Sequence, residues 1–461
     1  MTMFREERDS IGAMNVPVDA YYGVQSLRAK ENFKITGQMM HAELIKALME
    51  LKIASAQANA DAGVFGEDIK DAIVQAGYEV LDGKFWDNFI VDAIQGGAGT
   101  SANMNANEVL ANRAIEILGG AKGDYSIVHP NDHVNCGQST NDVYPSAGRI
   151  AIIRLLAKAV TELERLAAAF DDCADRFKTV ITMGRTEMQD AVPISLGRSF
   201  GAFASAVRRD IKRFATAAET LSTINMGGTA IGTGINADKQ YIKKIADYVS
   251  KVTGLDMKQA GDLVDATQNA DELVYVSGII KSCAVSLSKI SNDLRLMSSG
   301  PRCGFGEINL PPRQNGSSIM PGKVNPVMPE MLSQVAYRVI GNDLTVTASA
   351  EGGQLELNAF EPVMFHSIFE SLDILRNGVS CFIDYCVSGI TANEEHCKQS
   401  VYNSIGIVTA LCPYIGYTES SKIAKIAAKE NKRVYDVIIE QGIMTQEKLD
   451  ELLEQVIADA Q

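Results

Sequence analysis

The chain has 461 residues, of which 46% are hydrophobic and 22% are charged, a composition typical of a globular protein with a large core. Its formal net charge is −14, and no strongly basic stretch offsets it, which argues against nucleic acid or an anionic membrane as a partner. An anionic substrate remains compatible with this charge, because only the binding site itself has to be positive.

Features of export and membrane insertion are not evident in the sequence. The first residues, "MTMFREERDS", contain no apolar signal core, and no run of about 18 apolar residues predicts a membrane span. The eight cysteines form no Cys-x-x-Cys motif, and several lie in apolar helical runs. We therefore expect free thiols rather than disulfides, in a cytoplasmic protein.

Three regions of different character follow one another along the chain. Residues 1–140 mix short extended pieces with modest helices over 41–62 and 67–82, and are expected to form an N-terminal domain. Residues 141–390 carry long helical patterns and are expected to form a central domain. Residues 391–461 return to short helices, which predicts a small C-terminal helical domain.

The central region is predicted to be a mainly α bundle of long helices. Over 147–178 there is no proline, and Leu156, Val160 and Leu163 recur at spacings of four and three. Similar patterns predict four more long helices, over 196–223, 265–299, 327–350 and 356–388. Several of these helices carry apolar residues on more than one face. We expect other subunits to cover part of that surface, rather than one chain forming a thick core alone.

A first polar loop, "QGGAGTSANMNANEVLANRA" at residues 95–114, leads from glycines into a helical pattern. Thr100 stands where a helix N-cap is expected, and capping alone would explain a single threonine. The neighbouring glycines and asparagines favour a second interpretation. Free backbone N–H groups and hydroxyls at a helix start can bind an anion.

A second polar loop precedes the first long helix, in "NDHVNCGQSTNDVYPSAGRIA" at residues 131–151. Ser139, Thr140 and Asn141 offer more hydroxyl and amide groups than a cap needs, and Pro145 is tolerated near a helix start. His133 is either a ligand or base, or a histidine satisfied by structural hydrogen bonds.

The third polar loop, "NGSSIMPGKVNP" at residues 315–326, lies between two long predicted helices. Prolines and glycines break regular structure there, Lys323 supplies a mobile positive charge, and Asn325 can both donate and accept hydrogen bonds. A surface loop is the simplest interpretation. The position between buried helices favours a mobile lid over a site.

Metal and nucleotide sites are not predicted. The chain has five histidines, and His129 and His133 are separated by Pro130, so they do not share a regular helical face. Dinucleotide-binding and Walker glycine loops do not occur in a suitable context.

The three loops together resemble the signature regions of the aspartase/fumarase superfamily: "GAGTSANMNANE", "GQSTNDVYP" and "GSSIMPGKVNP". The resemblance runs nearly from end to end. "YYGVQSLRA", "QGGAGTS", "QSTND" and "KVNPVMPE" are similar to the aspartase branch. Class II fumarases more often read "QTGSGT", "QSSND" and "KVNPTQCE" at the last three.

The resemblance implies a three-domain, mainly α fold whose central helices assemble into the multi-helix core of a homotetramer, with each active site built from three subunits. It implies reversible deamination of L-aspartate to fumarate and ammonium without a cofactor. Activation by a divalent cation at a remote site is left open. Site residues follow from the matched motifs. Ser317 is the implied general base, and the implied dicarboxylate-binding residues are Thr100, Ser139, Thr140, Asn141, Thr186, Ser318, Lys323 and Asn325.

This chemistry explains why hydroxyls and amides gather in the loops. Removing the Cβ proton of aspartate leaves extra negative charge on the adjacent carboxylate, as an aci-carboxylate. Donors aimed at that carboxylate stabilise the transition state more than the substrate. Thr100, Ser139, Thr140 and Ser318 are suited to this β-carboxylate, whereas Thr186, Lys323 and Asn325 would hold the α-carboxylate. A serine base is unusual, so we expect lid closure to aim backbone N–H groups and Lys323 at Ser317.

Glu187 departs from the pattern of the relatives, which usually carry Gln or His at this position. Facing the substrate ammonium, a carboxylate would favour aspartate over malate by charge pairing. Alternatively, Glu187 faces solvent or pairs with an arginine such as Arg185. The competing functions are fumarate hydratase, cleavage of larger succinyl substrates, and a non-catalytic structural protein on the same scaffold.

Overall fold

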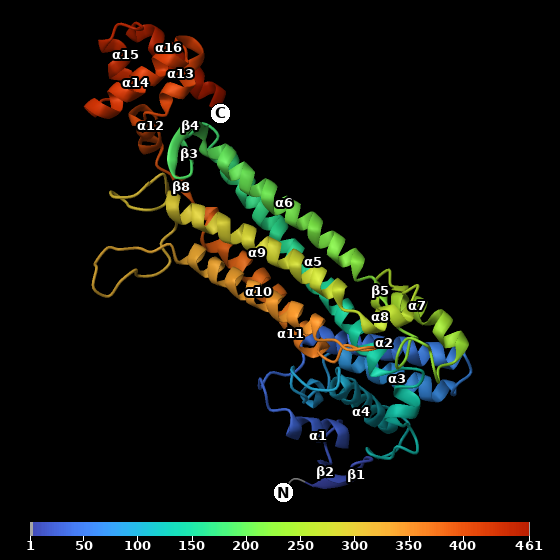
Figure 1. The fold of residues 1–461 in the computed structure, drawn as a ribbon. Helices are drawn as coiled ribbons and strands as arrows, with labels where there is room; N and C mark the ends of the chain where they lie inside the picture. The colour runs from blue at the N-terminus through green and yellow to red at the C-terminus, as the bar shows by residue number, and fades with distance from the viewer. Residues whose placement is uncertain (1–2, 461) are drawn as a thin grey trace. The chain divides into compact units, whose positions relative to one another are not determined.

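A computed structural model describes residues 3–460 of the chain. The protein is mainly helical, as predicted, and its elements are labelled in Figure 1. It divides into two compact units. Unit 1 comprises Met1–Ala159, Arg213–Lys281 and Arg338–Ile374, and unit 2 comprises Val160–Lys212, Ser282–Tyr337 and Leu375–Gln461. The predicted domain boundaries at 140 and 390 stay a prediction.

Five long helices each contribute residues to both units: α5 (Thr140–Arg176), α6 (Leu196–Thr220), α9 (Asp271–Met297), α10 (Val327–Glu351) and α11 (Glu361–Tyr385). Within unit 1, Ser277 and Lys281 on α9 bond to Asp343 on α10 at 2.8 and 2.6 Å. Within unit 2, the rings of Phe170 on α5 and Phe203 on α6 pack with centroids 5.6 Å apart. The predicted helix bundle is confirmed in both units.

Helix α5 begins at Thr140, so Thr140 and Asn141, which were expected to precede the long helix, are its first two residues. Pro145 lies inside the helix and has no N–H group to bond the carbonyl of Asn141, four residues before it. The side chain of Asn225 supplies the missing donor, with Nδ2 2.9 Å from that carbonyl oxygen. The proline is therefore tolerated because a distant residue satisfies the carbonyl that it leaves unpaired.

Unit 1 contains the remaining N-terminal elements. Its helices are α1 (Val24–Asn32), α2 (Ala42–Asp61), α3 (Glu67–Leu81), α4 (Thr100–Ile117), α7 (Lys239–Thr253) and α8 (Leu263–Gln268), with short helices at Trp86–Asn88 and Pro130–Val134. β1 (Phe4–Arg8) pairs antiparallel with β2 (Ala13–Pro17), and β5 (Thr223–Ile224) pairs parallel with β6 (Lys258–Gln259). The helix predicted over 265–299 is two helices, because Asn269 is extended between α8 and α9.

Unit 2 carries two further strand pairs and the C-terminal helices. β3 (Ile181–Thr186) and β4 (Gln189–Ser195) form an antiparallel hairpin, and β7 (Ile308–Asn309) pairs with β8 (Thr391–Ala392). The helices are α12 (Glu394–Asn403), α13 (Ile407–Ile415), α14 (Tyr417–Glu430), α15 (Val434–Glu440) and α16 (Gln446–Ala460), after a short helix at Val387–Gly389.

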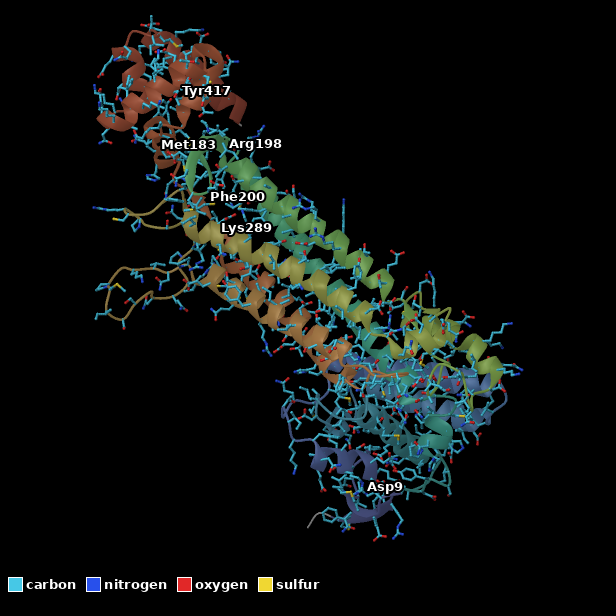
Figure 2. All side chains as sticks on the ribbon, viewed as in Figure 1. Asp9, Met183, Arg198, Phe200, Lys289 and Tyr417 are labelled. Atoms are coloured by element: carbon cyan, nitrogen blue, oxygen red, sulfur yellow. The ribbon has the colours of Figure 1, made fainter. Side chains whose placement is uncertain are left out.

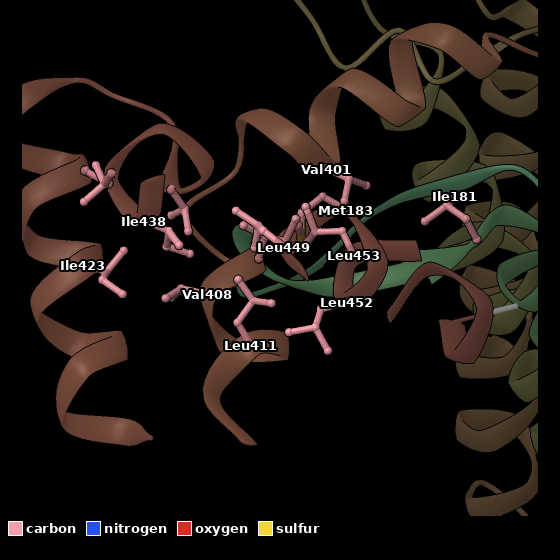
Figure 3. Packing of buried hydrophobic residues seen from close by; sticks show 14 residues of the cluster. Ile181, Met183, Val401, Val408, Leu411, Ile423, Ile438, Leu449, Leu452 and Leu453 are labelled. Carbon is pink, nitrogen blue, oxygen red and sulfur yellow. The ribbon is translucent and has the colours of Figure 1, made fainter. Parts of the chain in front are cut away.

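A hydrophobic core joins the β3–β4 hairpin to the C-terminal helices (Figure 3). Ile181 and Met183 of β3 are buried together with Leu411 of α13, Ile438 of α15 and Leu449 of α16. Side chains alternate between the two faces of a strand, so Ile181 and Met183 lie on the same face. This packing fixes the base of the hairpin in unit 2.

All eight cysteines are free, four of them buried, in agreement with the predicted thiols. Helix α9 meets the length and composition of a membrane-crossing helix, with a mean hydropathy of 1.4 over its most apolar window. Half of that window is buried within the chain, and packed core helices pass the same test.

Candidate active site

The first signature loop begins α4 with a glycine rather than with a threonine cap. Gly99 is the N-cap and adopts a left-handed conformation with φ of 89°. A Cβ atom there would lie 2.5 Å from the ring of Tyr144, so no larger residue fits. Thr100 is the first helical residue, and its Oγ1 donates a 2.6 Å hydrogen bond to the carbonyl of Gly97. The capping interpretation of Thr100 is therefore wrong.

The amide groups at the start of α4 are largely occupied. The N–H of Thr100 bonds to the carbonyl of Gly97 at 2.9 Å, and the N–H of Ala102 bonds to the side chain of Gln95 at 2.8 Å. The predicted row of free amides is thus reduced. An anion at this helix start would depend mainly on side-chain donors.

The second signature loop is organised by a reciprocal cap at the start of α5. Ser139 Oγ accepts from the N–H of Asn141 at 3.2 Å, while Asp142 Oδ1 accepts from the N–H of Ser139 at 2.9 Å. Asp142 Oδ2 also accepts from the N–H groups of Gly227 and Thr229, at 3.1 and 3.0 Å. The buried carboxylate therefore holds the Ser139–Asn141 loop against residues 227–229.

Thr140 connects the first two signature loops. Its Oγ1 accepts a 3.2 Å hydrogen bond from Asn103 Nδ2 on α4, which leaves the hydroxyl hydrogen of Thr140 available for another acceptor. Asn141 Nδ2 donates to the carbonyl of Ala230 at 2.7 Å, so part of its side chain has a structural role. Within unit 1 the structure thus brings Thr140 and the α4 segment together.

The sequence analysis missed a buried lysine behind this loop. Lys52 of α2 is 0% exposed, and its Nζ donates to Asn135 Oδ1 and Gln138 Oε1, both at 2.9 Å. Burial lowers the pKa of Lys52 to about 7, although the charge of Asp142 opposes the shift. Burial likewise raises the pKa of Asp142 to about 6, against its backbone hydrogen bonds and the charge of Lys52. The sequence feature that could have revealed this residue is a lysine flanked by the apolar residues Leu51 and Ile53 of α2.

The two histidines near this loop serve the backbone. His129 Nδ1 accepts from the N–H groups of Asn131 and Asp132, each at 3.2 Å, and His133 Nδ1 accepts from the N–H of His129 at 2.9 Å. Burial lowers the pKa of His133, which favours the neutral ring. The interpretation of His133 as a structurally satisfied histidine is confirmed. Across residues 3–460, no group of three or more His, Cys, Asp or Glu side chains is placed to hold a metal ion.

In unit 2, Thr186 and Glu187 lie at the tip of the β3–β4 hairpin. Glu187 and Met188 form its two-residue turn, with φ values of 52° and 67°, as the right-handed twist of hairpins favours. Glu187 also lines a cavity of about 600 Å³ between the hairpin, α6 and α9. Arg198 and Lys289, labelled in Figure 2, line the same cavity. The Arg185 side chain is bonded to Glu307, at 2.7 and 3.2 Å, so the proposed pairing of Glu187 with Arg185 is not formed.

The third signature loop is closed at its neck by backbone contacts. The N–H of Gly316 bonds to the carbonyl of Lys323 at 3.0 Å, and Asn325 Nδ2 donates to the carbonyl of Gly316 at 2.9 Å. A Cβ on Gly316 would lie 2.1 Å from that Lys323 oxygen, so the crossing requires glycine. Beyond the neck, Ile319 is 82% exposed.

Ser317 lies just inside this neck and already receives two backbone donors. Its Oγ accepts from the N–H groups of Ile319 and Met320, at 3.2 and 3.1 Å. Such bonds are common for serines in turns, but they also place positive dipoles on the oxygen that would lose its proton. Ser318 and Lys323 are exposed on the same loop.

The predicted site residues therefore form two sets. Thr100, Ser139, Thr140 and Asn141 belong to unit 1. The other six belong to unit 2. Two of them, Thr186 and Glu187, lie at the hairpin tip, and the remaining four lie on the loop 315–326. Among the described residues, no hydrogen bond joins the hairpin-tip pair to the four loop residues.

Comparison with known proteins agrees with the motifs along nearly the whole chain. Residues 12–341 match the family model described as Lyase, and residues 407–455 match the one described as Fumarase C C-terminus. The chain is 50% identical to the aspartate ammonia-lyase of Bacillus subtilis (strain 168), over 98% of this chain and 95% of the relative. It is 48% identical to that of Escherichia coli (strain K12), over 97% and 94%.

Solved structures give the same result. A fumarate lyase:delta crystallin from Brucella melitensis bound to cobalt superimposes with a TM-score of 0.97, at 48% identity and 100% coverage of both chains. A class II fumarase from Schistosoma mansoni superimposes with a TM-score of 0.95, at 35% identity and 99% coverage of both. The chain therefore belongs to the aspartase/fumarase superfamily.

Proposed function

We propose that this protein is an aspartate ammonia-lyase, a carbon–nitrogen lyase that interconverts L-aspartate with fumarate and ammonium. The observation that carries the assignment is identity of about half of all residues, over nearly full length, with several proteins named aspartate ammonia-lyase. The chain is less similar to the class II fumarase, at 35% identity. The three polar loops that the reaction needs are intact.

Proton removal from Cβ is the difficult step, and the donors of unit 1 fit the charge that it creates. The resulting aci-carboxylate needs hydrogen-bond donors that point at its oxygens. The hydroxyl of Thr140 is suited to this task, because Asn103 donates to its oxygen and leaves its hydrogen available. Ser139 and Ser318 are proposed as further donors to the same carboxylate. Thr100 would join them by turning its hydroxyl hydrogen away from the carbonyl of Gly97.

Ser317 is the proposed base. Its oxygen needs stabilisation as an alkoxide, and the N–H groups of Ile319 and Met320 already point at it. The charge of Lys323 would add to these dipoles when the loop closes over substrate. Lys323, Asn325, Thr186 and Asn141 are proposed to bind the rest of the dicarboxylate.

Glu187 is proposed to face the ammonium group of the substrate. The nearest arginine along the chain, Arg185, is engaged by Glu307 and leaves the Glu187 carboxylate without that partner. A carboxylate attracts –NH3⁺ and has no comparable attraction for the hydroxyl of malate. Fumarate hydratase is the second candidate, favoured by the TM-score of 0.95 with a class II fumarase.

A homotetramer with active sites shared between subunits is proposed as the working form. The long helices expose large apolar side chains in the single chain, among them Tyr275, Val285, Tyr337 and Leu344, the last of which is 70% exposed. Burying such side chains against other copies is favourable. We further propose a cytoplasmic enzyme that needs no organic cofactor or catalytic metal.

Fumarate absorbs ultraviolet light, whereas aspartate does not, so turnover of purified protein can be followed directly. The assignment predicts that L-aspartate yields fumarate and an equal amount of ammonium, before and after treatment with a chelator. Light scattering during size-exclusion chromatography should give about four times the chain mass of 49.7 kDa. A well-folded protein that releases no ammonium would contradict the assignment.

A further inference from the structure

The hairpin tip that carries Thr186 and Glu187 is held by one buried carboxylate. Glu307 is 1% exposed and accepts two hydrogen bonds from the Arg185 guanidinium, 2.7 Å at Oε1 and 3.2 Å at Oε2. The hydroxyl of Thr182 also donates to Oε1. Both donors belong to β3, so Glu307 contacts the strand directly before its turn.

Glu307 is itself fixed by its backbone. Its N–H donates to the carbonyl of Met297 at 2.9 Å, and its carbonyl accepts from the N–H of Asn393 at 2.9 Å. The thiol of Cys397 donates to the same carbonyl at 3.5 Å. The carboxylate therefore has little freedom to follow Arg185, and Arg185 must stay where Glu307 holds it.

The arrangement keeps the charge of Arg185 away from Glu187. Arg185 is two residues before Glu187 and is the closest arginine or lysine along the chain. Its guanidinium lies 4.2 Å from the ring centroid of Phe305, where a cation–π contact adds to the Glu307 pair. The cross-strand partner of Arg185 is Asp190, which instead accepts from Ser404 Oγ at 2.6 Å. Each charged residue beside the tip thus has its partner outside the hairpin.

We propose that Glu307 is a positioning residue for substrate specificity: by holding Arg185, it leaves the carboxylate of Glu187 free to bind the substrate ammonium. The inference rests on the proposed contact between Glu187 and that ammonium. Glu307 does not touch substrate. Glu307 acts through Arg185. Loss of the Glu307 charge would release the Arg185 side chain, which is 21% exposed, to turn toward Glu187.

Three variants test this arrangement: Glu307→Gln, Arg185→Gln and the double variant Arg185→Gln/Glu307→Gln. Glu307→Gln should raise KM for aspartate about fivefold with kcat within about twofold, because the released guanidinium neutralises Glu187. Arg185→Gln and the double variant should both stay within about twofold of the parent KM, because neither carries a guanidinium at position 185 that could pair with Glu187. A purely structural role predicts that Arg185→Gln is impaired about as much as Glu307→Gln, because either single variant leaves one partner of the buried pair unpaired.

Amination of fumarate supplies a further readout. Glu307→Gln should raise KM for ammonium and leave KM for fumarate nearly unchanged, whereas a displaced hairpin would raise both. Glu50→Gln is the matched control, since Glu50 also forms a two-bond pair, to Arg154 at 2.7 Å, and contacts neither β3 nor Glu307. Its KM values should equal those of the parent.

Glu187→Gln separates failure of this inference from failure of the proposed contact. If Glu187→Gln leaves KM for aspartate unchanged, the contact with ammonium is wrong, whatever the other variants do. The positioning role of Glu307 is wrong if Glu187→Gln raises KM for aspartate but the double variant has a KM for aspartate as high as that of Glu307→Gln. Should Glu307→Gln fail to fold, Arg185→Gln decides: a KM raised as much as in Glu187→Gln contradicts the inference.

Discussion

Glu361 is a carboxyl group that the fold keeps protonated at neutral pH. It is buried at the start of α11, and its Oε2 has no hydrogen-bond partner. Burial raises its pKa to about 8, although the charge of Arg149 opposes the shift. The unfolded chain releases this proton near the ordinary pKa of a glutamate, 4.5, so the native state binds more protons between the two pKa values. Stability from this group is complete below pH 4.5 and is lost as pH rises toward 8.

Replacing Glu361 by glutamine removes this titration and keeps the shape. Well below the folded pKa, this group lowers the unfolding free energy by about 1.36 kcal/mol for each unit of rising pH. Between pH 6 and 8 the parent should therefore lose about 2 kcal/mol of unfolding free energy, and Glu361→Gln should not show this loss. Urea unfolding of both proteins across this range measures the difference. Protein concentration must be held fixed, because assembly contributes to stability.

Glu394→Gln is the matched control, because Glu394 is also the first residue of a helix but is exposed. Its unfolding free energy should run parallel to that of the parent over the whole range. Parallel curves for Glu361→Gln as well would refute the reasoning, since they would mean that Glu361 is ionised in the native state.

Three further changes test the site and its support. Ser317→Ala should keep the melting temperature and lower kcat for aspartate by at least about a thousandfold, and near-normal turnover would eliminate Ser317 as the base. Gly99→Ala should destabilise the protein by about 2 kcal/mol or more in thermal unfolding, because its Cβ would meet Tyr144 at a φ of 89°; an unchanged melting temperature would contradict this. Leu449→Ala should cost about 2–5 kcal/mol in urea unfolding by opening the core beneath the hairpin, whereas a loss below about 1 kcal/mol would show that the core closes around the gap.

The long helices could be predicted because apolar residues repeat along them, but their ends depend on distant partners. Helix α5 begins a few residues before the expected start, and nothing near Pro145 in the sequence shows that Asn225 satisfies the freed carbonyl. Helix α7 was missed although Asp238 and Gly254 cap its two ends. The β3–β4 hairpin was missed because its turn, Glu187–Met188, lacks the glycine or asparagine that marks such turns.

The site residues followed from motifs, whereas their contacts could not be predicted. Side-chain partners such as Asn103 for Thr140 and Glu307 for Arg185 are 37 and 122 residues apart in the chain. The burial of Lys52 depends on how α2 packs, which periodicity alone does not reveal. Roles of the predicted site residues remain predictions for the experiments above.

The most direct test of the central claim compares L-aspartate with L-malate as substrates of the same purified protein. Fumarate formation is followed by its ultraviolet absorbance at equal substrate concentrations. An ammonia-lyase with Glu187 at the ammonium predicts rapid fumarate formation from aspartate and none above background from malate. Fumarate from malate alone would contradict both the assigned reaction and the role of Glu187.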